Sequence, residues 1–128
     1  MARPVYVVGI GPGALEYITP AAMEIIREAD VLVAGERTLN QFLGLDKLTF
    51  PIKNNLAEMI GFIQEHRVEK NVAVLASGDP GMFGIINYLR KHFATGDLQV
   101  IPGISSMQLA CARLGISWHD GLLASTHG

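Results

Sequence analysis

The sequence is poor in cysteine, in clustered charge and in long apolar runs, and each shortage excludes a class of protein. The single Cys111 rules out a disulfide framework within the chain and fits a reducing compartment. CxxC pairs and Cys/His zinc spacings are absent, so we expect no metal site. The net charge is −2 without a basic block, which argues against nucleic acid as a partner.

The N-terminal apolar run ends at Gly9, which makes it too short for a signal sequence or a membrane span. We therefore expect a cytoplasmic protein that does not bind a membrane. The chain has enough apolar residues for a core, because 49% of its 128 residues are hydrophobic and only 17% are charged. This length corresponds to one domain, residues 1–128.

Short β-branched runs alternate with segments of helical periodicity. The pattern predicts strands at residues 5–8, 31–34, 48–50, 72–76, 98–101 and 122–124, with Pro51 ending the third. Helices are predicted after a Thr19-Pro20 cap, at 37–43, 56–66 and 82–92, and from a Ser105 or Ser106 cap to Leu114. This alternation predicts an α/β fold: a single αβα three-layer domain with a mostly parallel sheet.

Three turns rich in glycine and proline follow three of the predicted strands, at residues 9–13, 77–81 and 102–106. In a parallel sheet, turns that follow strands lie at the same carboxyl edge, where such folds bind their ligands. Glycine clusters also mark places where backbone approaches backbone or ligand closely. We therefore expect a ligand site formed by these three turns together.

The first turn matches the dinucleotide-binding pattern GxGxxG/A through Gly9, Gly11 and Ala14. In that pattern the glycines open the helix, so that its N-terminus meets the pyrophosphate. Here the predicted helix starts later, at Thr19-Pro20, and Pro12 has no N–H for a phosphate. An NAD(P)-binding oxidoreductase domain therefore stays an alternative, not the first choice.

The three turns contain no basic residue and one carboxylate, Asp79. This composition suits a neutral or cationic ligand, such as a sulfonium nucleoside, better than a polyphosphate. Asp79 could attract positive charge or bind a hydroxyl or amino group. It could equally be a turn residue before Pro80, because Asp-Pro-Gly is a common turn signal. Both interpretations stay open.

The segments VVGIGPGALEYIT, VLASGDPGMFG and VIPGISSMQLACARLGISWHD together resemble the tetrapyrrole methylase family, which uses S-adenosylmethionine (SAM). They occur in the order and spacing of that family, and the likeness runs from Val5 to the end of the chain. SGDPGMFG, PGISSMQLACARLG and the closing ASTHG are most similar to the members that methylate C5 of precorrin-6Y or cobalt-precorrin-7 in cobalamin (vitamin B12) biosynthesis.

The resemblance implies a set of contacts, carried over by motif. SAM would contact Pro12, Ser77, Gly78, Asp79, Met82, Ser105 and Ser106. The precorrin, a tetrapyrrole, would lie near Gly11, Gly13 and His127. The family also implies a homodimer and a second, C-terminal αβα domain that this chain does not include. The implied methyltransferase activity therefore belongs to the parent enzyme.

Several further expectations and alternatives remain. We expect Cys111 to lie in the core and Trp118 to fill a hydrophobic gap, and Glu36 after the second strand has no assigned role. Other family activities are alternatives: uroporphyrinogen-III or another precorrin as substrate, diphthamide synthesis, or ribosomal RNA ribose methylation. A non-enzymatic alternative is a domain that mainly self-associates through exposed apolar surface.

Overall fold

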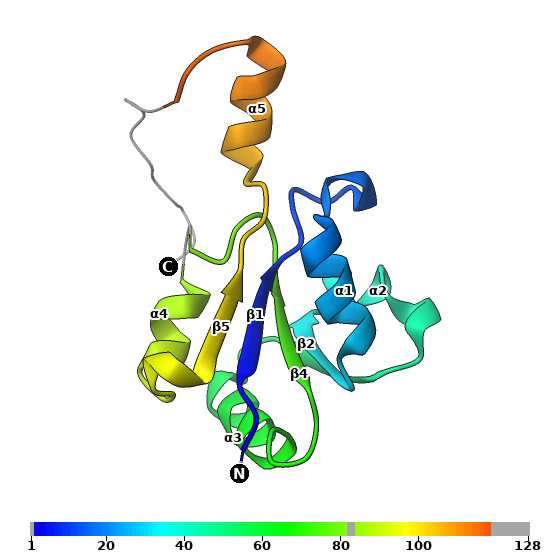
Figure 1. The fold of residues 1–128 in the computed structure, drawn as a ribbon, viewed down its shortest axis with the longest axis vertical. Coiled ribbons are helices and arrows are strands. Elements are labelled where there is room, and N and C mark those ends of the chain that lie inside the picture. The colour runs from blue at the N-terminus through cyan, green and yellow to red at the C-terminus, as the bar shows by residue number, and fades with distance from the viewer. Residues whose placement is uncertain (1, 82–83, 119–128) are drawn as a thin grey trace.

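A five-stranded sheet forms the centre of the structure, a computed structural model that describes residues 2–81 and 84–118 (Figure 1). Its strands are β1 (Val5–Gly9), β2 (Val31–Gly35), β3 (Leu48–Ile52), β4 (Val72–Ala76) and β5 (Leu98–Ile101). The spatial order is β3-β2-β4-β1-β5, and every pairing between these strands is parallel. The predicted α/β class with a parallel sheet is thus confirmed.

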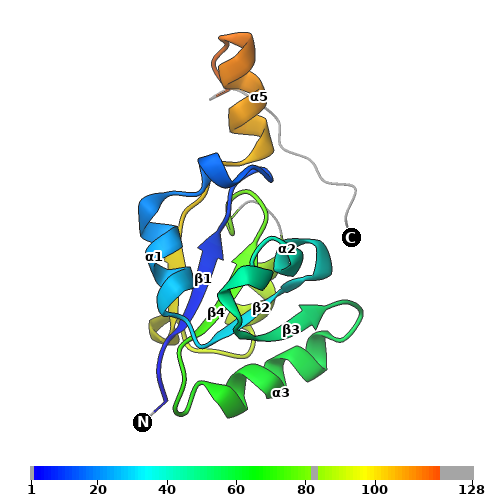
Figure 2. The same ribbon diagram turned by 90° about the vertical axis from the view of Figure 1, so that its right-hand side faces the viewer.

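The helices of the described residues cover both faces of the sheet, except for the last. They are α1 (Pro20–Glu28), α2 (Glu36–Asn40), α3 (Leu56–His66), α4 (Ile85–Arg90) and α5 (Ser106–Leu114). Short 3-10 turns, η1 to η3, occupy Leu15–Tyr17, Leu43–Leu45 and Thr95–Asp97. Helix α5 stands beyond the carboxyl ends of the strands, at the opposite end of the molecule from the N-terminus (Figures 1 and 2). None of these helices is both long and apolar enough to cross a membrane.

Alternate residues of the central strands point to opposite layers, as the two-residue period of a strand requires. On one face the buried strand residues Val5, Val7, Val31, Val33, Val72 and Val74 pack with residues of α3 and with Leu89 and Phe93 at α4. On the other face Val8, Leu32, Ala34, Ala73 and Leu75 pack with residues of α1 and with Leu39 and Phe42 at α2. Strands buried on both sides explain the continuous apolar runs in the sequence.

The connections place a topological switch point between β1 and β4. These strands are neighbours, but α1 after β1 packs on one face and α4 after β4 packs on the other. The connections that follow these two strands therefore lead to helices on opposite faces of the sheet. Open α/β sheets bind ligands in the crevice at such a point.

Most predicted elements are present, with differences at the edges. The strand predicted to stop before Pro51 continues to Ile52, because β3 is an edge strand, where the missing N–H of proline is tolerated. The predicted helix at 37–43 is divided, since α2 ends at Asn40 and a 3-10 turn follows. Helix α4 is shorter than predicted and ends at Arg90. The predicted strand at 122–124 lies outside the described residues.

Candidate functional site

The three glycine-rich turns meet at the carboxyl edge of the sheet, as predicted. Gly11 and Gly78 exchange two backbone hydrogen bonds: the Gly78 amide donates to the Gly11 carbonyl at 2.8 Å, and the Gly11 amide donates to the Gly78 carbonyl at 3.2 Å. Both glycines have positive φ angles, 78° and 67°, which other residues rarely adopt. The loops after β1 and β4 are therefore joined directly across the switch point.

The third loop is packed against this pair without any intervening side chain. A β-carbon added at Gly9 would lie 2.6 Å from the Gly103 nitrogen and 2.7 Å from the Gly78 carbonyl oxygen. A β-carbon added at Gly103 would collide with the same Gly78 carbonyl. Gly9 and Gly103 were not among the predicted site residues, although their presence in glycine-rich turns was a visible signal. Hereafter the contact of Gly9, Gly11, Gly78 and Gly103 is called the glycine junction.

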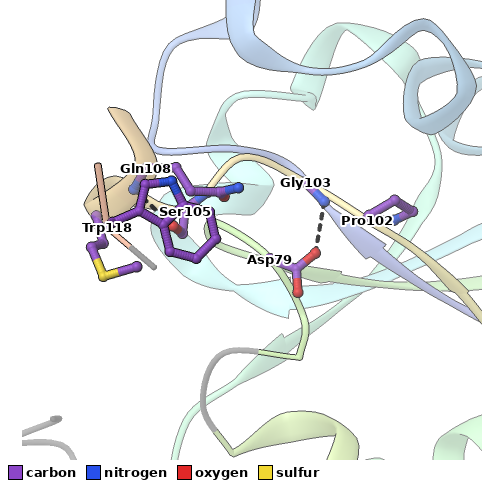
Figure 3. Close-up of a pocket in the computed structure, with 7 residues that line it drawn as sticks. Asp79, Pro102, Gly103, Ser105, Gln108 and Trp118 are labelled. Atoms are coloured by element: carbon purple, nitrogen blue, oxygen red, sulfur yellow. Dashed lines mark hydrogen bonds between the residues drawn. The ribbon is translucent and has the colours of Figure 1, made fainter. Parts of the chain in front are cut away.

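Asp79 adds a side-chain link to the glycine junction (Figure 3). Its Oδ1 accepts a hydrogen bond from the Gly103 amide at 3.0 Å, and its Oδ2 accepts one from the Gly81 amide at 2.9 Å. The first bond joins the loop after β4 to the loop after β5, and the second is local to the turn. The turn interpretation of Asp79 therefore has direct geometric support.

Ser105 is a helix cap at the start of α5. Its hydroxyl accepts from the Gln108 amide at 3.0 Å, and its own amide donates to Gln108 Oε1 at 2.8 Å, which completes a capping box. This selects Ser105 over Ser106 as the cap. Ser105 is buried, and its Cα would be 3.4 Å from a β-carbon added at Gly78, so α5 starts at the glycine junction. Ser106 is exposed.

A pocket of about 280 Å³ opens beside Asp79 (Figure 3). It is lined by Asp79, Pro102, Gly103, Ser105, Met107, Gln108 and Trp118. Among the described residues of this lining, Asp79 is the one that is charged, so they give the pocket negative and apolar character and no cation to pair with phosphate. Gln108 was missed as a lining residue, although the Ser-x-x-Gln spacing of a capping box was readable in the sequence.

Two expectations for this region were wrong. Trp118 does not fill a hydrophobic gap: it is 45% exposed and lines the pocket. Cys111 does not lie in the core, because it is half-buried on a helix that has no buried residue. The error at Cys111 arises because the apolar side of α5 is not buried against the other described residues.

The other predicted residues lie around the glycine junction or outside the described part of the chain. Pro12 is half-buried and Ser77 is exposed. Gly13 is exposed, has a φ of 118°, and its carbonyl accepts a hydrogen bond from Gln41 Nε2 at 3.4 Å. Met82 and His127 lie outside the described residues, so the structure does not test them.

Glu36, which had no assigned role, begins α2 directly after β2. It forms an exposed ion pair with Lys53 after β3, with 3.9 Å between Oε2 and Nζ. Within residues 2–81 and 84–118, no group of three or more His, Cys, Asp or Glu side chains is placed to bind a metal ion. The late start of α1 at Pro20, after a β1 that ends at Gly9, agrees with the argument against a dinucleotide-binding turn.

Comparison with known proteins finds a matching family and similar sequences along almost the whole chain. The tetrapyrrole (corrin/porphyrin) methylases match residues 4–128. The cobalt-precorrin-7 C(5)-methyltransferase of Salmonella typhimurium is 41% identical over 122 residues, which are 95% of this chain and 60% of that protein. The probable cobalt-precorrin-7 C(5)-methyltransferase of Methanocaldococcus jannaschii is 39% identical over 127 residues, which are 97% of this chain and 60% of that protein.

The fold agrees with these sequence matches. The crystal structure of the precorrin-6Y methylase from Archaeoglobus fulgidus superposes with a TM-score of 0.74 at 29% identity, covering 89% of this chain and 59% of that one. The chain spans 60% of the length of the two curated relatives. From the family match over nearly its whole length, together with these identities, the chain belongs to the tetrapyrrole methylase family.

Proposed function

We propose that this chain is the SAM-binding N-terminal part of an enzyme that methylates C5 of cobalt-precorrin-7 or of precorrin-6Y in cobalamin biosynthesis. The proposed reaction is supported by the 41% and 39% identity to C5-methyltransferases along almost the entire chain. The proposed cofactor is supported by the junction of three turns at the switch point of the sheet, where such folds bind their ligands.

The proposal concerns the whole enzyme, because the relatives are longer than the matched region. The part of the relatives that this chain does not match would supply the C-terminal αβα domain, the remaining cofactor contacts and one wall of the substrate cleft. The family resemblance further leads us to propose a homodimer that acts in the cytoplasm. Sedimentation of the full-length enzyme and fractionation of cells would test these two points.

The described residues fit SAM in chemical character. The pocket combines the Asp79 carboxylate with the apolar Met107 and Trp118, and none of its lining residues in 2–81 and 84–118 is cationic. The adenosine of SAM, which carries no phosphate, matches such a surface. We assign the cofactor to Pro12, Ser77, Gly78, Asp79, Met82, Ser105 and Ser106, and the precorrin to the neighbourhood of Gly11, Gly13 and His127.

Within this proposal, the protein mainly positions the reactants. SAM, when bound, supplies an activated methyl group on a sulfonium, so holding it in line with the acceptor carbon is the main catalytic requirement. The glycine junction would serve this role because its three loops pack backbone against backbone, with no space for a side chain at Gly9 or Gly103. Met107 of α5 and Trp118, which follows the helix, would shield one side of the pocket from water.

The test is calorimetric titration with S-adenosylhomocysteine, followed by an activity assay. The chain and the full-length enzyme are titrated in parallel, beside Gly96→Ala, whose added β-carbon meets no atom within 4 Å. The full-length enzyme is then given cobalt-precorrin-7 and methyl-labelled SAM, and NMR of the product locates the label. We expect saturable binding and label at C5; label at another carbon would favour a different tetrapyrrole methylase. A full-length enzyme without binding or methyl transfer would contradict the proposal.

A further inference from the structure

Asp79 is the one side chain that links the loop after β4 to the loop after β5 by a hydrogen bond, among the contacts of the described residues. The glycine junction brings these loops into van der Waals contact, but the junction by itself has no hydrogen bond between Gly78 and Gly103. The hydrogen bond from the Gly103 amide to Asp79 Oδ1 therefore fixes the orientation of the two loops, which van der Waals contact alone does not.

The position of this bond matters for the pocket. Asp79, Gly103 and Ser105 lie side by side in the pocket lining, and α5 begins immediately after Ser105 (Figure 3). A loop after β5 that moved away from the loop after β4 would carry the start of α5 with it. The distance between Asp79 and the pocket walls at Met107 and Trp118 would then change.

Both carboxylate oxygens of Asp79 are already engaged by backbone amides. Hydrogen bonds from N–H groups to a carboxylate are charge-assisted and stronger than neutral ones. The remaining attraction for a ligand cation acts across a half-buried, solvent-accessible pocket, where the effective dielectric is high and charge interactions are weak.

We propose that Asp79 is a positioning residue, which sets the width of the SAM pocket through the Gly103 amide, and that it does not bind SAM by attracting the sulfonium charge. The proposal rests on the proposed function for the identity of the ligand. It makes a prediction that a charge partner would not make: Asp79 should matter equally for cationic SAM and for neutral S-adenosylhomocysteine.

The first experiment measures the affinities of the full-length enzyme for both ligands in Asp79→Asn and Asp79→Ala. We expect Asp79→Ala to weaken both by the same factor, about 10-fold or more, because charge-assisted bonds are lost. Asp79→Asn, which keeps one acceptor oxygen, should weaken both less. A selective loss of SAM affinity, with S-adenosylhomocysteine affinity retained and Asn no better than Ala, would overturn the proposal.

The matched control is Asp30→Ala. Asp30 Oδ2 accepts a hydrogen bond from the Asn71 amide at 2.8 Å, which is the same kind of contact, but it lies at the amino end of the strands. We expect this variant to keep the affinities of the unsubstituted enzyme for both ligands.

The second experiment needs no ligand and uses the 128-residue chain. Hydrogen exchange by NMR should be faster at the Gly103 and Gly81 amides in Asp79→Ala, and faster at one of them in Asp79→Asn, while Asp30→Ala leaves both unchanged. Unchanged exchange at Gly103 in Asp79→Ala would overturn the positioning role. If the unsubstituted enzyme bound neither ligand, the proposed function would fail, and the exchange data would still decide whether Asp79 holds the two loops together.

Discussion

The glycine junction and helix α5 lie at the same edge of the sheet but are stabilised in different ways. The junction consists of backbone packed on backbone, and Gly11 and Gly78 are buried. Helix α5 has good local signals at both ends: a capping box at Ser105 and a left-handed Gly115 with a φ of 69°. Yet none of its residues is buried, and Figure 2 shows it projecting from the layers.

This difference shows that local signals can define the conformation of a segment without packing it against the rest of the protein. Local capping is enough to define α5 as a helix, but a helix of 9 residues without a packed face is marginal on its own. Leu114, the last residue of α5, is 72% exposed, and Ile116 and Trp118 beyond the helix are 56% and 45% exposed. The junction has the opposite character, because close contact leaves only one arrangement of the three loops.

The largest effect is expected from Gly103→Ala. Its new β-carbon would collide with the Gly78 carbonyl and with the backbone of Gly9, and backbone atoms cannot turn aside as the end of a flexible side chain can. We expect a loss of about 3 kcal/mol in the free energy of unfolding, measured by urea denaturation. Gly96→Ala, at an open position, should stay within about 0.5 kcal/mol of the unsubstituted chain. A junction that tolerated alanine at 103 as well as at 96 would remove the contrast with α5.

A smaller and more local effect is expected from Ser105→Ala. The substitution removes the hydroxyl that caps α5 and should cost the helix about 1 kcal/mol. Amide exchange within α5 should accelerate, while the amides of β1 and β4 keep their protection, because α5 buries no side chain against them. Equal acceleration in the central strands would mean that α5 and the sheet unfold together, contrary to the comparison.

The smallest effect on stability is expected from Leu114→Ser. Since Leu114 is 72% exposed, the free energy of unfolding should change by less than about 0.5 kcal/mol. Its effect should appear in association instead: light scattering of the 128-residue chain at high concentration should fall, because exposed apolar surface drives self-association. Lys91→Ser, at an exposed position beside α4, provides the control and should leave scattering unchanged.

The fluorescence of Trp118 reports on the pocket beside α5, because Trp118 is the single tryptophan of the chain. Its half-exposed position in the pocket predicts emission typical of a solvent-accessible indole that iodide can quench. S-adenosylhomocysteine bound in this pocket should shift the emission to shorter wavelength and reduce quenching. Saturable binding by calorimetry without any change in emission would place the ligand away from Trp118.

Much of the site could be predicted from sequence because its features are local. The turns at 9–13, 77–81 and 102–106 were identified from their glycine and proline residues. Their position at one edge of the sheet followed from the predicted parallel strands. The burial of Cys111 was predicted wrongly, because periodicity shows that a helix has an apolar side but not what covers it. The packing of Trp118 was also predicted wrongly, and this residue lies beyond the helix, where no periodicity applies. Pro51 was misjudged because its tolerance depends on the edge position of β3.

The sequence by itself determined the strands, the capped helices and the three turns, since β-branched runs, cap residues and glycines act on their own neighbours along the chain. Only the tertiary structure decided the strand order, the switch point between β1 and β4, and the role of Asp79 as an acceptor for Gly103. These depend on contacts between residues far apart in the chain. Asp79 and Gly103 become partners only because parallel strands bring the ends of β4 and β5 to one edge, on either side of β1.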